Sequence, residues 1–224
     1  DSNEYISWLV EGPPAQPWQQ GKPHPIVNLE PPYENHIAYH SRKPFDADMT
    51  RKRLYWSLLV SPTAGVTYGG HGVWGWDDGT KPPEDHEGTG IPLPWQAALL
   101  MPAAEQIPHL VNLFNAFAWW DLQPTPEILI EQPGILDKER FVTAARASKS
   151  GKIVIYMPHG STIQLHPAHL AADFVATWFD PRTGEQYPAP GELTGSSWTV
   201  TAPNSLDWVL LVFTKTQERL SDKE

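Results

Sequence analysis

The stretch Pro25-Ile-Val-Asn-Leu-Glu-Pro-Pro-Tyr-Glu34 decides the fold that this sequence predicts. Its short apolar run ends at Glu30, and the two prolines that follow prevent a strand from continuing, because proline cannot donate a backbone hydrogen bond to a sheet. Active sites of (β/α)8 barrels are built at the carboxyl ends of such strands. We therefore predict a barrel strand that presents Glu30 as a catalytic carboxylate.

The elements after Glu30 indicate which strand of the barrel this is. A helix, a strand and a second helix are predicted over residues 49–59, 65–76 and 95–117, with Asp46 or Asp48 as the cap of the first and Pro102 and Pro108 as breaks or kinks in the last. A whole barrel takes about 250 residues, or roughly thirty for each strand and helix. The apolar run is therefore assigned to strand seven and residues 65–76 to strand eight, since strand four would require four further strands that are not visible.

Beyond Gln123-Pro-Thr-Pro126, which is typical of a domain boundary, the sequence changes to short alternating strands separated by turns. Strands are predicted over residues 141–146, 152–157, 162–165, 174–179, 197–200 and 208–214. Their spacing favours a small antiparallel β-sandwich. The predicted fold is thus α/β plus all-β: residues 1–124 form the C-terminal part of a (β/α)8 TIM barrel, 125–216 a β-sandwich and 217–224 a polar tail.

Composition excludes several classes of function. The formal net charge of −10 and the pI near 5.3 argue against a nucleic-acid partner, which needs a basic face. No apolar run approaches the roughly 20 residues of a membrane span, so no membrane partner is expected. The absence of cysteine excludes disulfides and thiolate ligands, and we expect no metal and no cofactor. Eleven tryptophans are many for this length, and indole rings can serve as platforms for sugar rings.

Five motifs follow one another in the order Asn28-Leu-Glu-Pro-Pro-Tyr-Glu34, Arg51…Tyr55-Trp56, Ala64-Gly65…Thr67-Tyr68-Gly69, His71-Gly-Val-Trp74 and Trp178-Phe-Asp-Pro-Arg-Thr-Gly184. In this combination the chain resembles the apiosidase-like glycoside hydrolases, (β/α)8 proteins with a C-terminal β-sandwich that has been labelled collagen-binding. The resemblance covers residues 25 to 213. It implies a retaining glycosidase with a nucleophile after strand seven and an acid/base after strand four, about 5 Å apart.

By this resemblance Glu30 matches the nucleophile. The acid/base has no counterpart, because strands one to six are absent from the sequence. Residues expected to contact substrate are Tyr33, Glu34, His71, Trp74 and Trp76, and those expected to support the site are Asn28 and Arg51.

Several alternatives stay open at these positions. Glu30 can instead be a structural carboxylate paired with Arg51 or Arg53, and His71 can be a buried structural histidine. One of Trp74 and Trp76 is expected to be a sugar platform and the other a core residue. The acidic run Glu84-Asp-His-Glu87 favours a solvated or substrate-rim loop over a metal cluster, because consecutive residues cannot all converge on one ion.

We therefore predict a C-terminal fragment or subunit of a retaining glycoside hydrolase that acts on polysaccharide side chains or glycosides. A quarter of a barrel would leave strand edges unpaired, so we expect two partners: a carbohydrate substrate and a second polypeptide that completes the barrel. A periplasmic or extracellular location is favoured, with any signal peptide on the missing N-terminal part. The alternative is a noncatalytic carbohydrate- or protein-binding scaffold, built from a degenerate barrel and a β-sandwich.

Overall fold

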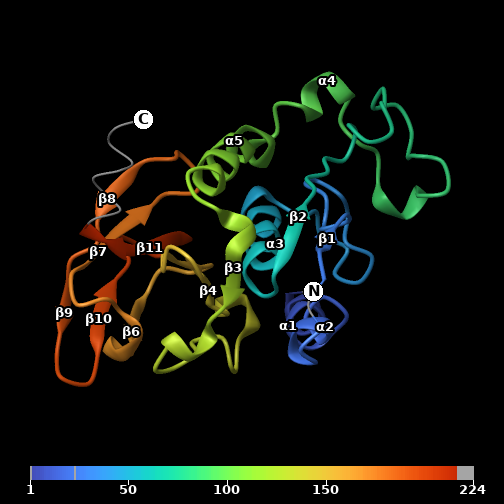
Figure 1. Cartoon of the computed structure of the whole chain (residues 1–224). Helices are drawn as coiled ribbons and strands as arrows, with labels where there is room; N and C mark the ends of the chain where they lie inside the picture. Colours follow the sequence, from blue (N-terminus) through green and yellow to red (C-terminus); the bar gives the residue numbers. More distant parts are fainter. Residues whose placement is uncertain (1, 23, 216–224) are drawn as a thin grey trace.

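The computed structural model describes residues 2–22 and 24–215 (Figure 1). The polar tail predicted at 217–224 lies outside these residues. The α-helices are α1 Ser2–Glu11, α2 Gln16–Gln19, α3 Ala47–Leu59, α4 Trp95–Ala98 and α5 Pro102–Asn115. Short 3₁₀ helices are η1 Glu87–Thr89, η2 Trp119–Asp121, η3 Pro126–Ile128, η4 Lys138–Arg140 and η5 Pro167–His169. Within the described residues, no helix is both long and apolar enough to cross a membrane.

Strands β1 Ile26–Asn28 and β2 Thr63–Val66 pair in parallel, and α3 connects them. The pairing continues beyond the strands, since the backbone N–H of Glu34 donates to Gly69 O at 2.9 Å. The side chain of Asp46 accepts from Met49 N at 2.8 Å, which confirms one of the two predicted caps of α3. The strand predicted over 65–76 is wrong in its extent, because β2 begins earlier and the glycine-rich residues after it form turns.

The helix predicted over 95–117 is divided into α4 and α5. Pro102 begins α5, where the missing N–H of proline costs no hydrogen bond and its fixed φ suits a first helical residue. Pro108 lies inside α5 without ending it. The prediction of a break was therefore correct at Pro102.

The remaining strands form two antiparallel sheets. They are β3 Leu122–Pro124, β4 Thr143–Ala147, β5 Ile153–Met157, β6 Thr162–Leu165, β7 Phe174–Phe179, β8 Gln186–Pro188, β9 Gly191–Leu193, β10 Trp198–Thr201 and β11 Trp208–Thr214. The larger sheet has the order β3-β4-β5-β11-β7-β8 and the smaller one β6-β10-β9. They share a core that includes Ile155, Leu165, Trp178 and Trp198.

All six strands predicted from alternating apolar residues are present, within two residues of the predicted limits. Strands β3, β8 and β9 were not predicted. Each has only three residues and contains a proline or a glycine, residues that are disfavoured inside strands. The predicted boundary at residues 123–126 overlaps β3, which pairs with β4, so the larger sheet begins at Leu122.

Helix α3 lies between the parallel pair and the larger sheet (Figure 1). A second apolar cluster joins residues of α1, α3 and α5 to the face of that sheet opposite the smaller one. Tyr55 of α3 stacks on Tyr156 of β5, with ring centroids 4.6 Å apart and planes 7° apart. The larger sheet is thus buried on both faces, since one face packs against the smaller sheet and the other against the helical part.

Candidate active site

A cleft of about 540 Å³ opens beside the carboxyl end of β1, and we call it the Glu30 cleft. Its lining residues are Tyr5, Glu30, Pro31, Pro32, Tyr33, His36, Ala38, Tyr39, His40, Phe45, Trp74 and His86. Most of this wall is aromatic or imidazole. Glu30 is the one carboxylate among the described residues that line it, and neither lysine nor arginine contributes to the lining.

Glu30 lies two residues beyond the end of β1, and its side chain is exposed. Within the described residues its carboxylate forms no hydrogen bond or ion pair. The alternative of a structural pair is not found, because Arg51 binds Asp207 and Arg53 donates to Met49 O. The carboxylate is therefore open to a molecule that enters the cleft.

Tyr33 lies close to Glu30 in the same wall. Partial burial, and secondly the negative charge of Glu30, raise the pKa of the Tyr33 hydroxyl. The hydroxyl thus stays protonated at neutral pH and can donate a hydrogen bond. No bond joins it directly to Glu30 in the described structure.

The two candidate tryptophans differ in position. Trp74 lines the Glu30 cleft, and its indole meets the ring of His86 edge to face at 5.2 Å. Trp76 lies outside the cleft lining and is 69% exposed, and its ring centroid is 5.1 Å from that of Trp95. Neither is a core residue, contrary to the expectation that one of them would be.

His71 is buried behind the cleft wall and does not line it. Its Nδ1 lies 3.2 Å from Asn35 O and its Nε2 3.2 Å from the hydroxyl of Thr89. Its ring is 5.4 Å from that of His36, which does line the cleft. Burial lowers the pKa of His71. These contacts fit the structural alternative for His71 better than a direct contact with substrate.

Glu34 was expected to contact substrate, and its position contradicts that expectation. The side chain is buried at the start of α5, where its two oxygens accept from Ala103 N at 2.9 and 3.1 Å. A carboxylate at this end of a helix satisfies a free N–H and faces the positive end of the helix dipole. Tyr68 also donates its hydroxyl to Glu34 at 2.8 Å. Both carboxylate oxygens are therefore occupied by the protein.

The two supporting residues also lie elsewhere than expected. Arg51 forms a buried bidentate pair with Asp207, both contacts being 2.7 Å long, so it cannot neutralise Glu30. Asn28 donates its side-chain amide to Tyr5 at 2.6 Å and to Ser57 at 2.8 Å. Asn28 thus holds the end of β1 against α1 and α3, and it supports the position of the strand rather than the carboxylate itself.

The sequence analysis missed several cleft residues, among them His36, Tyr39, His40, Phe45 and His86. The first four come from the segment after Glu34, to which the sequence analysis assigned no part of the site. The dense run of rings there was a signal that could have been used. His86 comes from the acidic loop, and in the described part of the chain no three acidic, histidine or cysteine side chains are arranged to hold a metal ion.

Comparisons with known proteins identify families and structures to which the chain is similar. Residues 13–121 match the family described as "Apiosidase-like, catalytic domain". Residues 124–213 match the family described as "Putative collagen-binding domain of a collagenase". The resemblance seen in the five sequence motifs is thereby confirmed.

Solved structures with a similar fold are glycoside hydrolases. One described as a glycoside hydrolase has a TM-score of 0.78 and 21% identity, over 96% of this chain and 47% of that one. A glycoside hydrolase of family 5 from Bacteroides vulgatus has a TM-score of 0.77 and 19% identity, over 96% of this chain and 46% of that one. The chain thus spans about half the length of these proteins. No curated protein matches its sequence.

Proposed function

We propose that this apiosidase-like chain is the C-terminal portion of a glycoside hydrolase barrel, with β1 and β2 as strands seven and eight and the two sheets as an accessory β-sandwich. The parallel pair joined by α3 supports the proposal, because such a unit is the repeat from which a (β/α)8 barrel is built. The cleft opens where active sites of such barrels lie, at the carboxyl end of a strand.

Glu30 is the nucleophile in this proposal. The observation that carries it is the position of an exposed, unpaired carboxylate in an otherwise aromatic cleft at the end of β1. A carboxylate oxygen of Glu30 attacks the anomeric carbon and forms an ester as the bond to the leaving oxygen breaks and an acid protonates that oxygen. Water then attacks the same carbon, a base takes its proton, and Glu30 leaves as a carboxylate.

The substrate is a carbohydrate whose ring packs against the aromatic wall. Trp74 is the one tryptophan among the described residues of the lining and offers its indole to a sugar ring, and Tyr33 offers a hydroxyl donor beside the nucleophile. Trp76 contacts only a substrate that extends beyond the cleft. We expect Trp74→Ala to weaken substrate binding by about tenfold, as loss of one aromatic contact and its buried area implies, and Trp76→Ala to have a smaller effect.

The acid/base and the rest of the barrel come from outside these 224 residues, on a further segment of the same protein or on a second polypeptide. Among the described residues β1 pairs only with β2, and Val27 and Leu29 are 46% and 64% exposed. An apolar strand with a free edge is unfavourable in water and favours pairing with another strand. Native and denaturing mass spectrometry of the purified complex tests this, and copies of this chain alone would contradict it.

Chemical rescue tests the role of Glu30 in the assembled protein. Glu30→Gly is expected to abolish hydrolysis of an activated aryl glycoside, because no ester can form. Azide should restore turnover and give a glycosyl azide of inverted configuration, since azide takes the space of the missing carboxylate. The control Glu131→Gln removes an exposed carboxylate far from the cleft in sequence and should leave activity unchanged. An active Glu30→Gly protein without azide would exclude Glu30 as nucleophile.

A noncatalytic binding scaffold is the second candidate. The observation that favours it is that the described cleft holds one carboxylate, whereas a retaining enzyme needs two. A structure of the assembled complex separates the two functions. A second carboxylate about 5 Å from Glu30 supports the enzyme, and its absence supports the scaffold.

A further inference from the structure

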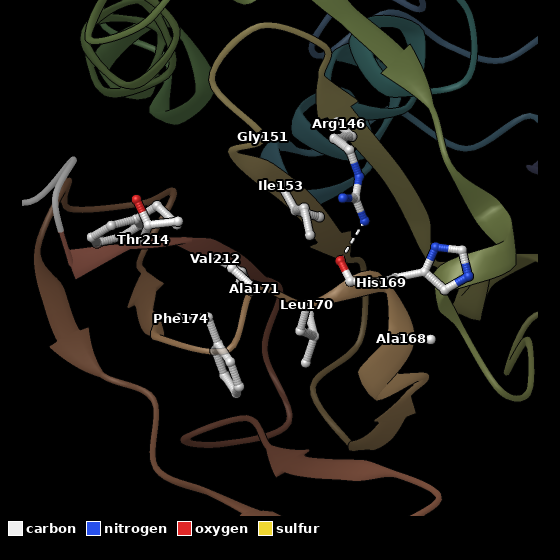
Figure 2. A pocket seen from close by; sticks show the side chains of 11 residues that line it. Arg146, Gly151, Ile153, Ala168, His169, Leu170, Ala171, Phe174, Val212 and Thr214 are labelled. Carbon is white, nitrogen blue, oxygen red and sulfur yellow. Dashed lines mark hydrogen bonds between the residues drawn. The ribbon is translucent and has the colours of Figure 1, made fainter.

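A second cavity, of about 220 Å³, lies at one end of the larger sheet, where β4, β5, β7 and β11 meet the segment around η5, and Figure 2 shows it from close by. Four apolar side chains, Ile153, Leu170, Phe174 and Val212, contribute to its wall. Arg146 of β4 reaches into the same space. The cavity is on the face of the larger sheet opposite to α3 and α5, because Ala144, two residues before Arg146, packs in the core between the sheets.

Arg146 is the chemically distinctive member of this cavity. One of its terminal nitrogens donates to His169 O at 2.5 Å, and the side chain is half-buried (Figure 2). A guanidinium carries five N–H donors in a planar fork. In the described part of the chain no carboxylate forms an ion pair with Arg146. Arg51 and Arg182, by contrast, both pair with Asp207.

The wall beside this fork is apolar and firmly packed. Phe174 meets Trp198 of the smaller sheet edge to face, with ring centroids 5.0 Å apart. Ile153 and Val212 belong to adjacent strands of the larger sheet and are buried. A planar cation next to a fixed apolar wall complements a carboxylate attached to a compact hydrophobic body, since arginine binds carboxylates through two parallel hydrogen bonds.

We propose that this cavity is a binding site for a small carboxylate with a hydrophobic body, such as an aromatic or branched aliphatic acid. The carboxylate pairs with the free donors of Arg146, and the body packs against Leu170, Phe174 and Val212. The cavity volume equals that of roughly seven waters at about 30 Å³ each, enough for a single ring with its carboxylate. The site is independent of the Glu30 cleft and of the reaction proposed there.

Methyl NMR of the full chain during titration with benzoate tests the site directly. We expect ring-current shifts confined to the methyl groups of Ile153, Leu170 and Val212, with affinity in the millimolar range that suits a ligand of this size. Benzamide, which has the same shape without the charge, should bind about tenfold more weakly, as loss of a charge-assisted pair implies. Equal binding of benzamide would overturn the role of Arg146.

Variants distinguish the effect of the planar guanidinium of Arg146 from the effect of positive charge in general. Arg146→Met should weaken benzoate binding by about tenfold, and Arg146→Lys, which keeps the charge but not the planar fork, should also weaken it. Lys149→Met removes a positive charge from the exposed turn after β4 and should change affinity less than about twofold. Circular dichroism checks that each variant is folded.

Three further results would contradict the proposal. If Arg146→Lys is folded and binds benzoate as well as the unaltered chain does, the fork is not needed. If galacturonate binds at this cavity more tightly than benzoate, the hydrophobic body is not what the wall selects. Shifts spread over the surface, with none at Ile153, Leu170 or Val212, would show nonspecific association only and would likewise exclude the site.

Discussion

The ring of Tyr33 lies against the α-carbon of Gly69, so close that a Cβ at position 69 would be 2.1 Å from Cδ1 of the ring. Tyr33 follows β1 and lines the Glu30 cleft, whereas Gly69 follows β2. Gly69, at the end of the second strand, has no side chain and therefore leaves room for the ring of Tyr33. That ring lies beside the carboxylate of Glu30 at the end of the first strand.

Gly69→Ala should displace Tyr33, because neither backbone can move without breaking the bond between Glu34 N and Gly69 O. We expect a loss of about 1–3 kcal/mol in the free energy of unfolding, as for other overpacked sites, and weaker carbohydrate binding. Urea denaturation measures the first effect. Gly195→Ala is the control: no atom lies within 4 Å of its added Cβ, and it should change stability by less than about 0.5 kcal/mol.

Asp207→Asn should destabilise the chain strongly. Asp207 accepts from Arg51, from Arg182 and from the hydroxyl of Tyr156, and its side chain is fully buried. Removing its charge leaves two guanidinium groups without their common counter-ion, which costs about 3–5 kcal/mol at buried sites. Asp48→Asn, which removes a half-exposed partner of Arg51 at 3.3 Å, should cost less than about 1 kcal/mol. Equal losses of stability in the two variants would show that the buried Arg51–Asp207 pair contributes no more than the half-exposed Arg51–Asp48 pair.

Glu34→Gln should lower the free energy of unfolding, whereas Glu30→Gln should leave it almost unchanged. Burial, and then its bond to Glu34, raise the pKa of Tyr68, so its hydroxyl donates to Glu34 at every ordinary pH. An amide at position 34 can turn only one oxygen to the two donors, and we expect a loss of about 1–3 kcal/mol. Glu30→Gln should alter stability by less than about 0.5 kcal/mol. Thermal unfolding distinguishes them, and a large loss at Glu30 would indicate a structural role.

Stability should fall as the pH falls below about 6.5, the unfolded pKa of histidine. Burial lowers the pKa of both His36 and His71. The two histidines thus bind protons at a lower pH in the folded chain than in the unfolded chain. Their contribution to stability is complete above the unfolded pKa, and it is lost as the pH falls through the lowered folded values. Each site adds a slope of at most about 1.4 kcal/mol per pH unit.

His71→Asn tests this pH dependence. Denaturant titrations at several pH values should give a shallower slope for this variant than for the unaltered chain. His159→Asn, at an exposed position, is the matched control and should keep the original slope. An unchanged slope in His71→Asn would assign the dependence to other groups.

Local patterns in the sequence predicted much of the fold. The apolar runs of β7 and β11 and the cap of α3 by Asp46 depend on neighbouring residues, and they were visible without tertiary information. The three-residue strands β3, β8 and β9 have no such pattern, since they form only because a longer strand lies beside them. The position of β2 was misjudged because glycines were taken as part of the strand and not as the turns after it.

The candidate active site could be predicted only for those residues whose position is determined by the end of a strand. Glu30 and Trp74 follow β1 and β2, and parallel strands bring their carboxyl ends together. The partners of Arg51 and Glu34 are Asp207 and the start of α5, which lie far away in the sequence. Nothing near Arg51 in the sequence indicates that it turns toward the two sheets and away from the cleft.

The larger sheet is buried on both faces, and this limits how the chain can be recombined. A module on a flexible tether can be exchanged between proteins because few contacts cross its border. Here the border between the helical part and the sheets is buried: Tyr55 stacks on Tyr156, and Trp56 donates its indole N–H to Phe141 O at 2.9 Å. Chimeras that replace residues 122–214 with another two-sheet unit are therefore expected to fold only when α3 is exchanged together with the sheet that it covers.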